Sequence, residues 1–370
     1  MIFYIYLGYP ILATLFGNIL RKKIKQENGF QPEVTILISA FNEEKNIEAT
    51  IKNKLQQTYP KEKIEIITIS DGSTDNTDNI VKKFENYRVK LIRQDPRAGK
   101  TAALNQGIRS ATGEIIIFSD ANSIYHPNAL QNLIRNFADP QIGYVTGKMI
   151  YSNPDGTTIG DGCSAYMKYE NFLRTQETNI GSIIGVDGGI DAVRKELYEP
   201  MNPDQLPDFV LPLKMVKKGY RVVYEPEALL WEPSLKKAQD EYRMRVRVAL
   251  RALWALWDMR QLLSFSKNKP FSWQLWSHKV LRYLCFIFLL SAYGANLLLW
   301  SEGGIYWSFF LIQTGGYIAA IGIYFMERKG FNIGIFYTLS YFTLLNLASA
   351  HAFVKFILGQ KLVVWTPRKG

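Results

Sequence analysis

Four short polar clusters each follow an apolar run in this 370-residue sequence, and they hold the residues best able to do chemistry. The clusters are Ala40-Phe41-Asn42-Glu43-Glu44, Asp71-Gly72-Ser73-Thr74-Asp75, Arg97-Ala98-Gly99-Lys100 and Asp120-Ala121-Asn122. Carboxylates bind hydroxyl groups and hard cations, while Arg and Lys bind phosphates. Taken singly, Asn42 also fits the N-cap of a following helix, and Asp71 to Thr74 fits a turn. Their joint occurrence after four apolar runs indicates one shared site.

One of these clusters needs a separate test, because residues 94–101 end in Gly-Lys-Thr and resemble a phosphate-binding P-loop. The P-loop pattern requires Gly at its first position. This chain has Gln94 there, with Pro96 and Arg97 inside the loop. The pattern therefore argues against a nucleoside triphosphatase.

The elements that must position these clusters are short apolar runs alternating with longer amphipathic ones. Strands are predicted at residues 34–39, 64–70, 89–92 and 114–119, and helices at residues 43–57, 77–85 and 101–111. This alternation predicts an α/β domain with a mostly parallel sheet and helices on both faces. Ligands of such sheets bind beyond the carboxyl ends of the strands, where all four clusters lie.

The runs ISAFNEEKNIEATIKN, ISDGSTDNT, RAGKTAALNQGI and ATGEIIIFSDAN, in this order and spacing, resemble glycosyltransferase family 2. The resemblance covers roughly residues 32–235. Within the family, the sequence is similar to exopolysaccharide synthases of the type that makes cellulose, hyaluronan or poly-N-acetylglucosamine. It implies the GT-A nucleotide-sugar-binding fold and an inverting hexosyltransferase (EC 2.4). The implied donor is a nucleotide-diphospho-sugar, with uridine as the expected base.

The resemblance also implies which residues bind the donor. It places the nucleoside at the first two clusters and the phosphates near the third. The substrate-binding residues expected there are Ala40, Asn42, Glu43, Asp71, Ser73, Arg97 and Lys100.

The fourth cluster corresponds to the family's D-x-D metal motif. The resemblance implies that Asp120 binds Mg²⁺ or Mn²⁺, because a hard cation neutralises the charge that develops on a leaving diphosphate. This chain has Asn122 in place of the second Asp. An amide oxygen can ligate a hard cation but contributes no charge, so a weaker metal affinity is expected. A purely structural turn at Asn122 is the alternative.

A general base is required, because the acceptor hydroxyl must lose its proton as it attacks. The family places an Asp at a helix start some 80 to 100 residues after the metal motif, and Leu206-Pro207-Asp208-Phe209-Val210-Leu211 resembles that segment. Asp208 is therefore the expected base, although Pro207 replaces the usual acidic neighbour. The alternative is an N-cap or first-turn acid without a catalytic role.

The segment from Gly185 to Arg194 resembles the family's Gly-rich stretch, in which Gly188 and Gly189 let an acceptor sugar approach the backbone. Asp187 and Asp191 are less usual in such a stretch, and they fit either sugar hydrogen bonding or solvated loop acids.

Processive synthases of the family carry a Q-x-x-R-W motif after the base, and this chain lacks it. It has Arg247, Arg251 and Trp254 in that region, as candidates for the diphosphate and for stacking on a sugar ring. A basic amphipathic helix on anionic lipid is the alternative for the same residues. The missing motif leaves open whether transfer is processive.

Membrane association is expected from the two ends of the chain. Residues 2–20 are apolar, and the basic residues Arg21, Lys22, Lys23 and Lys25 follow them. A cleavable signal peptide would carry its charges before the apolar core, so an uncleaved anchor with a cytoplasmic basic flank is expected. Three further spans are predicted at residues 280–300, 305–326 and 333–356.

The expected organisation is an anchor at residues 1–20, a cytoplasmic GT-A domain at 30–235, amphipathic interfacial helices at 236–272, about three transmembrane helices at 273–358 and a basic tail at 359–370. This multi-pass arrangement in the cell membrane contains a conflict. Four spans place the tail outside, whereas Lys361, Arg368 and Lys369 favour the inside. Whether one segment is interfacial or re-entrant stays open.

The formal net charge of +11 fits positive-inside flanks, anionic lipids and a diphosphate substrate better than nucleic acid, for which no motif is present. The expected partners are a nucleotide sugar, a glycan or lipid acceptor and membrane lipids, with export-machinery subunits left open. The leading hypothesis is extension of a polysaccharide, and the alternative is transfer of one sugar to a polyprenyl phosphate or glycolipid. A transporter or scaffold with an inactive transferase domain is disfavoured by intact acids at 71, 120 and 208.

Overall fold

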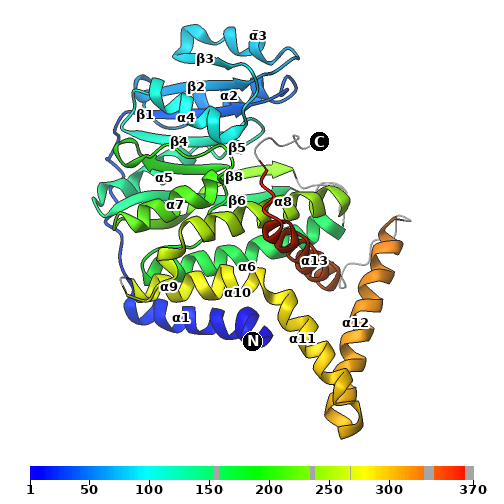
Figure 1. Ribbon diagram of the computed structural model, residues 1–370. Coiled ribbons are helices and arrows are strands. Elements are labelled where there is room, and N and C mark those ends of the chain that lie inside the picture. The colour runs from blue at the N-terminus through cyan, green and yellow to red at the C-terminus, as the bar shows by residue number, and fades with distance from the viewer. Residues whose placement is uncertain (153–157, 234–237, 267, 329–336, 363–370) are drawn as a thin grey trace.

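The computed structural model describes residues 1–152, 158–233, 238–266, 268–328 and 337–362. Its centre is an eight-stranded sheet with the order β3-β2-β1-β4-β7-β6-β8-β5. Helices cover both faces of the sheet, and a further layer of helices lies below it in the view of Figure 1.

The first half of the sheet is parallel. It consists of β1 (Val34–Ala40), β2 (Ile64–Asp71), β3 (Val89–Gln94) and β4 (Ile115–Asp120), with β1 between β2 and β4. The connecting helices are α2 (Ile47–Leu55), α3 (Thr77–Lys82) and α4 (Lys100–Ser110). All seven elements predicted for this stretch are present.

These strands are continuous apolar runs because both faces of the sheet are covered. Ile36 faces the core beneath α2, where Ile47 and Ile51 pack. Leu37, the next residue, faces the opposite core beneath α4, where Leu104 packs. The strand ends therefore leave the sheet between two helix layers, and the polar clusters meet at that edge.

The second half of the sheet is mixed, so the expectation of a mostly parallel sheet is wrong there. It contains β5 (Ile124–Tyr125), β6 (Ile142–Ser152), β7 (Ile190–Arg194) and β8 (Arg221–Pro233). Strand β7 runs antiparallel to both β4 and β6, whereas β6 and β8 are parallel to each other. The reason is the path of the chain, which returns through the 23-residue helix α6 (Thr158–Ile180) and enters β7 from the opposite end.

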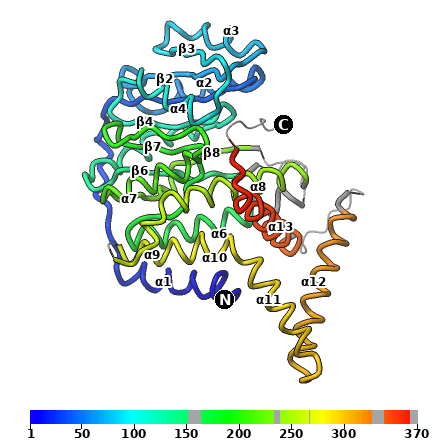
Figure 2. The backbone as a smooth tube through the Cα atoms, in the orientation of Figure 1, coloured from blue at the N-terminus to red at the C-terminus, as the bar shows by residue number. Residues whose placement is uncertain are grey.

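The remaining helices lie around this sheet, except α11 and α12, which project away from it (Figure 1 and Figure 2). They are α1 (Tyr9–Leu20), α5 (Ala129–Ile134), α7 (Pro207–Lys217), α8 (Ala238–Asp258), α9 (Lys269–Leu275), α10 (Leu281–Tyr283), α11 (Cys285–Leu298), α12 (Gly304–Arg328) and α13 (Tyr337–Ile357), with π-helical turns η1 (Tyr4–Gly8) and η7 (Trp276–Val280). Short 3₁₀ turns are η2 (Lys61–Lys63), η3 (Glu85–Tyr87), η4 (Arg135–Ala138), η5 (Lys195–Leu197), η6 (Arg260–Leu263) and η8 (Trp300–Glu302).

Helix α8 does not present its apolar face outward. One part of that face, including Leu250, packs against Ala348 and Ala352 of α13. Another part, including Ala255 and Leu256, joins the apolar core that also contains Leu37 of β1. Figure 2 shows α13 crossing α8, while α11 and α12 project away from the body of the protein.

Among the described residues, one helix, within residues 304–326, is long and apolar enough to cross a membrane. The run 269–283 and helix α11 would add a second such element if they are counted as one span bent by 59°. The N-terminal apolar helix, residues 4–20, is shorter. The expected tail residues Arg368 and Lys369 lie outside the part of the chain that the structure describes, whereas Lys361 forms an ion pair of 2.6 Å with Asp204.

Helix α1 packs one face on α6 and exposes the other. Tyr9, Ala13 and Gly17 are buried on the α6 side. Large apolar side chains at every fourth position, Phe3, Leu7, Ile11, Leu15 and Ile19, are each more than half exposed. The N-terminal helix therefore has a protein-facing face and an uncovered apolar face.

Candidate active site

A cavity of about 870 Å³ opens at the carboxyl ends of β1, β2 and β4 and continues toward α6, α10 and α13. Many of the residues expected from the sequence line it, namely Ala40, Glu43, Asp71, Arg97, Lys100, Asp120, Asn122, Asp208, Arg247 and Arg251. The cavity thus joins the ends of the parallel strands to the first turn of α7.

At the nucleotide end of the cavity, Asp71 holds the loop that carries Arg97. Its carboxylate accepts hydrogen bonds from the backbone N–H groups of Ala98 (2.8 Å) and Gly99 (3.0 Å). The Arg97 guanidinium lies 3.5 Å from Oδ2 of Asp71 and 3.5 Å from the centre of the Phe41 ring. Asp71 therefore fixes the wall of the cavity at this end.

Asn42 and Ser73 connect two loops behind that wall. The Asn42 N–H donates to Oγ of Ser73 at 3.1 Å, and the Thr74 N–H donates to Oδ1 of Asn42 at 2.8 Å. Neither Asn42 nor Ser73 is among the described residues that line the cavity. Asn42 is also not the N-cap of α2, because that position is Asn46. The structure gives both residues a part in shaping the loops.

Two acids meet at the ammonium of Lys100. Its Nζ lies 2.6 Å from Oδ1 of Asp120 and 3.9 Å from Oδ1 of Asp208. Burial alone would lower the pKa of Lys100, but the charges of Asp120 and Asp208 outweigh burial and raise this pKa above its ordinary value. The lysine therefore remains a cation between the end of β4 and the start of α7.

Asp208 lies in the first turn of α7, after Pro207 at the N-terminal end of the helix. The N-cap position is Leu206, so Asp208 does not cap the helix, and its side chain is 29% exposed toward the cavity. Proline at this position presets the helical backbone without leaving an unpaired N–H group. The helix start therefore presents a partly desolvated carboxylate to the cavity.

The residues expected to hold a divalent metal fit that task by their chemistry. Asp120 and Asn122 both line the cavity and both offer oxygen atoms, which hard cations prefer. No group of three or more His, Cys, Asp or Glu within the described ranges has metal-binding spacing. A cation such as Mg²⁺ ordinarily takes one or two protein carboxylates and completes its shell with substrate phosphates and water.

Gly188 and Gly189 belong to a loop, residues 185–189, that we name the acceptor loop. A Cβ atom on Gly188, whose φ is +82°, would lie 2.5 Å from Cγ of Asp208. A Cβ atom on Gly189 would lie 2.6 Å from Cδ2 of Leu230, inside the core. Neither glycine is a described lining residue of the cavity. Glycine is required at these positions for close packing, and at 188 this packing is against Asp208 itself.

The three candidate residues on α8 have different environments in the structure. Arg247 lines the cavity. Arg251 also lines it, but its guanidinium donates to the backbone carbonyls of Asp204 and Gln205, just before α7. Trp254 is not among the described residues that line the cavity. Its ring packs on Phe356, with centres 4.7 Å apart, and its Nε1–H donates to the carbonyl of Gln360. Arg251 therefore supports α7, and Trp254 anchors the end of α13.

Asp191, on β7, is fully buried behind the site. Burial and the nearby charge of Asp208 raise the pKa of Asp191 to about 8. Neither of its carboxylate oxygens accepts a hydrogen bond of normal geometry. The sequence singled out this residue as unusual but could not show that it lies in the interior.

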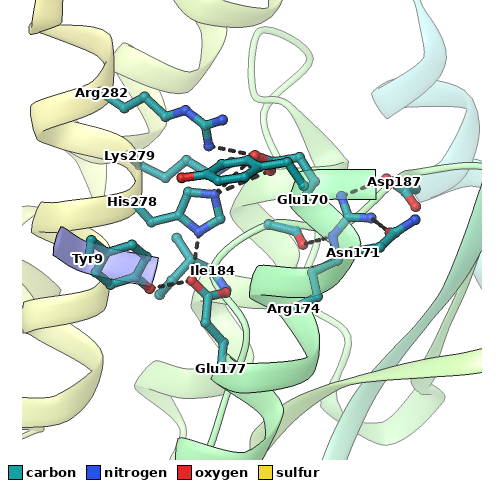
Figure 3. Close-up of polar contacts among 12 residues, drawn as sticks. Tyr9, Glu170, Asn171, Arg174, Glu177, Ile184, Asp187, His278, Lys279 and Arg282 are labelled. Carbon is teal, nitrogen blue, oxygen red and sulfur yellow. Dashed lines mark hydrogen bonds and ion pairs between the residues drawn. The ribbon is translucent and has the colours of Figure 1, made fainter. Parts of the chain in front are cut away.

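A buried polar network, which the sequence did not predict, joins the acceptor loop to the helices below the sheet (Figure 3). Arg174 of α6 donates to the carbonyl of Gly185 at 3.0 Å and forms an ion pair of 2.6 Å with Asp187. His278 contacts Glu177 at 2.6 Å and Glu170 at 3.2 Å. These contacts are long-range, so sequence spacing carries no signal of them.

The chain is similar to known proteins in sequence and in fold. The model of the family "Glycosyl transferase family 2" matches residues 35–199. The chain is 28% identical over 285 residues to the poly-beta-1,6-N-acetyl-D-glucosamine synthase of Staphylococcus aureus (strain COL), a match that covers 72% of this chain and 68% of the relative. The synthase of the same name from Staphylococcus epidermidis is 26% identical over 317 residues, covering 77% and 76%.

Among solved structures, the mannosyltransferase PcManGT from Pyrobaculum calidifontis, in complex with GDP-Man and Mn²⁺, has a TM-score of 0.74. The match covers 97% of each chain at 23% sequence identity, and it shows that the two proteins share a fold. The chain therefore carries a family 2 glycosyltransferase domain on a GT-A-like mixed sheet, and it is a glycosyltransferase with homology to polysaccharide synthases.

Proposed function

We propose that this glycosyltransferase takes a sugar from a nucleotide diphospho-sugar, a UDP-sugar in the first instance, and adds it to a growing polysaccharide at the membrane. The observation that carries the proposal is the placement of Lys100, Asp120 and Asp208 around one point of the cavity that Asp71 also lines. The homology to two synthases named for a poly-N-acetylglucosamine product supports a polysaccharide as the product.

The proposed reaction is a single displacement with inversion. An acceptor hydroxyl attacks the anomeric carbon, its proton passes to a carboxylate oxygen of Asp208, and the bond between that carbon and the diphosphate breaks. The diphosphate leaves with the electron pair and carries increased negative charge. Lys100, whose ammonium lies between the two carboxylates, is placed to stabilise that charge.

We assign Asp120 and Asn122 to a divalent cation, Mg²⁺ or Mn²⁺. A bound cation would supply charge neutralisation at the diphosphate. Lys100 then has two partners for its ammonium, Asp120 and the phosphates, and its side chain, 14% exposed, has little freedom to leave the site.

We further propose that residues 30–235 act on the cytoplasmic side of the cell membrane, with several apolar helices holding the protein there. Helix α12 supports this, since only 11% of its most apolar stretch is buried by protein. The exposed apolar face of the N-terminal helix and the basic residues that follow it at 21–25 give further support.

The test is a transfer assay on membranes from cells that produce the protein. Radiolabelled UDP-N-acetylglucosamine is the first donor, because of the relatives' products, and other UDP- and GDP-sugars follow. We expect a large water-soluble polymer that is absent with the Asp208→Asn variant. A product that is extracted into organic solvent would indicate that the acceptor is a lipid and not a growing polysaccharide. Absence of transfer from every donor would contradict the proposal.

A further inference from the structure

The end of the cavity farthest from Asp71, which we name the acceptor end, is rich in basic side chains. The acids that line it, among the described residues, include Glu170 and Asp187, and the lining acid Glu232 lies against the acceptor loop at Gly189. The basic residues that line it are Arg174, Arg245, Arg247, Lys279 and Arg282. This excess of cations in a partly enclosed space favours an anionic ligand.

Three of these cations are already engaged by protein, and one of them, Arg245, is paired with Glu241 at 2.7 Å. Arg174 is paired with Asp187 and donates to the carbonyl of Gly185. Arg282 is paired with Glu170 at 2.5 Å. Their guanidinium groups shape the acceptor end, and each has a carboxylate at contact distance.

Lys279 differs from these three arginines. Its nearest carboxylate oxygen, Oε2 of Glu170, lies 3.9 Å away, beyond hydrogen-bond distance. The same carboxylate already contacts Arg282 and His278. Within the described residues, the ammonium of Lys279 donates no hydrogen bond, although its side chain is only 14% exposed. An ammonium has three donors, and a largely desolvated one gains most from an anionic partner.

The position of this ammonium connects it to the proposed base. Figure 3 shows Lys279 reaching toward α6 between His278 and Arg282. A Cβ atom on Gly185 would lie 2.8 Å from Nζ of Lys279, so the lysine touches the acceptor loop. Gly188, which contacts Asp208, follows three residues later, a reach of at most about 10 Å of extended chain. A sugar at Asp208 and an anion at Lys279 can therefore belong to one ligand.

We propose that Lys279 determines acceptor specificity, its ammonium binding a phosphate or carboxylate that the acceptor carries next to the sugar whose hydroxyl attacks. This inference rests on the proposed function and adds the chemical class of the acceptor. Two sources supply such a group: the phosphate that links a sugar to a lipid, and an acidic sugar within a glycan.

Three synthetic acceptors with the same octyl tail test the proposal and separate the sources. They are octyl N-acetylglucosaminide, which is neutral, octyl N-acetylglucosaminyl phosphate, and octyl glucuronide extended by N-acetylglucosamine. The full-length protein in detergent is assayed with the donor that supports transfer. The variants are Lys279→Met, Lys279→Arg and, as the matched control, Lys269→Met, which removes an exposed lysine outside the described cavity lining.

We expect the unmodified protein to use an anionic acceptor about 10- to 100-fold more efficiently than the neutral one, as measured by kcat/KM. Lys279→Met should bring this ratio to about one, mainly through KM, while Lys279→Arg and Lys269→Met keep it. Preference for the phosphate alone indicates a lipid-linked acceptor, and preference for the glucuronide indicates an acidic glycan.

Equal use of neutral and anionic acceptors by the unmodified protein would overturn the inference and leave the proposed function intact. A preference that survives in Lys279→Met would also overturn it. Absence of transfer to any acceptor would instead contradict the proposed function, and the inference with it. Because the ratio compares two acceptors on the same protein, it does not depend on the fraction of Lys279→Met that folds correctly.

Discussion

A Cβ atom added to Gly188 would lie 2.5 Å from Cγ of Asp208, so the acceptor loop and the proposed base are in direct contact. Arg174 holds the same loop from the other side through Gly185 and Asp187. The position of the carboxylate that receives the acceptor's proton is therefore set jointly by α7, the acceptor loop and α6.

Gly188→Ala should lower kcat by about 100-fold, because the new methyl group displaces Asp208 and small displacements of a catalytic group are costly. Gly219→Ala is the matched control, since Gly219 has a similar φ of +88° with no atom within 4 Å of the added Cβ. Both variants pay similar backbone strain, of order 1–3 kcal/mol. Turnover per folded molecule, with melting temperature, separates the effects, and normal turnover in Gly188→Ala would contradict the contact's role.

Metal dependence is the second prediction. Excess chelator should stop turnover, and added Mn²⁺ should restore it. Asn122→Asp should lower the Mn²⁺ concentration that gives half-maximal rate, on the order of 10-fold, because a second carboxylate adds ligand charge. Asn128→Asp, at an exposed position outside the described cavity lining, serves as control. Undiminished rates in excess chelator would remove the role given to Asp120.

Lys100→Met should reduce kcat by about 100- to 1,000-fold, the usual loss when one group that stabilises developing charge is removed. Binding of the donor should weaken less than kcat falls, because the lysine acts most strongly on the charge of the leaving group. Steady-state kinetics with a donor-binding titration separates the two quantities. A variant that loses affinity and keeps its kcat would show that Lys100 only binds the ground state.

Asp191 gives a prediction about pH. Its pKa is raised to about 8 by burial and by Asp208, whereas an unfolded Asp titrates near 3.9. Between these values the folded protein binds the extra proton, so this group lowers stability as pH rises. Asp191→Asn should therefore gain stability over the unmodified protein, by up to about 1.4 kcal/mol for each pH unit above 4 until about 8. Melting temperatures at pH 5 and pH 8 test this, and an equal difference at both pH values would contradict it.

The sequence predicted the donor half of the fold well because its signals are local. Strands β1, β2 and β4 are Ile-rich runs, and each ends in a polar cluster, so the edge where the clusters meet followed from the α/β pattern alone. The role of Asn42 did not follow, since its positive φ of 54° and its bond to the Thr74 N–H depend on a neighbouring loop.

The second half could not be predicted for a physical reason. Its contacts join residues far apart in sequence, such as Arg282 with Glu170 and His278 with Glu177, and no periodic pattern records them. The apolar stripe of α8 has the same appearance whether it faces lipid or protein, and here Leu250 packs on α13. The sequence likewise made Trp254 a candidate for stacking on a sugar ring, whereas in the structure its ring packs on Phe356.

The most direct test compares the purified protein with its Asp208→Asn variant, using the donor identified on membranes. Nucleotide release and nucleotide binding are both measured, with Asp204→Asn as control because that side chain pairs with Lys361 instead. We predict that Asp208→Asn binds the nucleotide nearly normally and loses transfer by 100-fold or more, as expected for a general base. Full transfer by Asp208→Asn would contradict the central claim that this carboxylate takes the acceptor's proton.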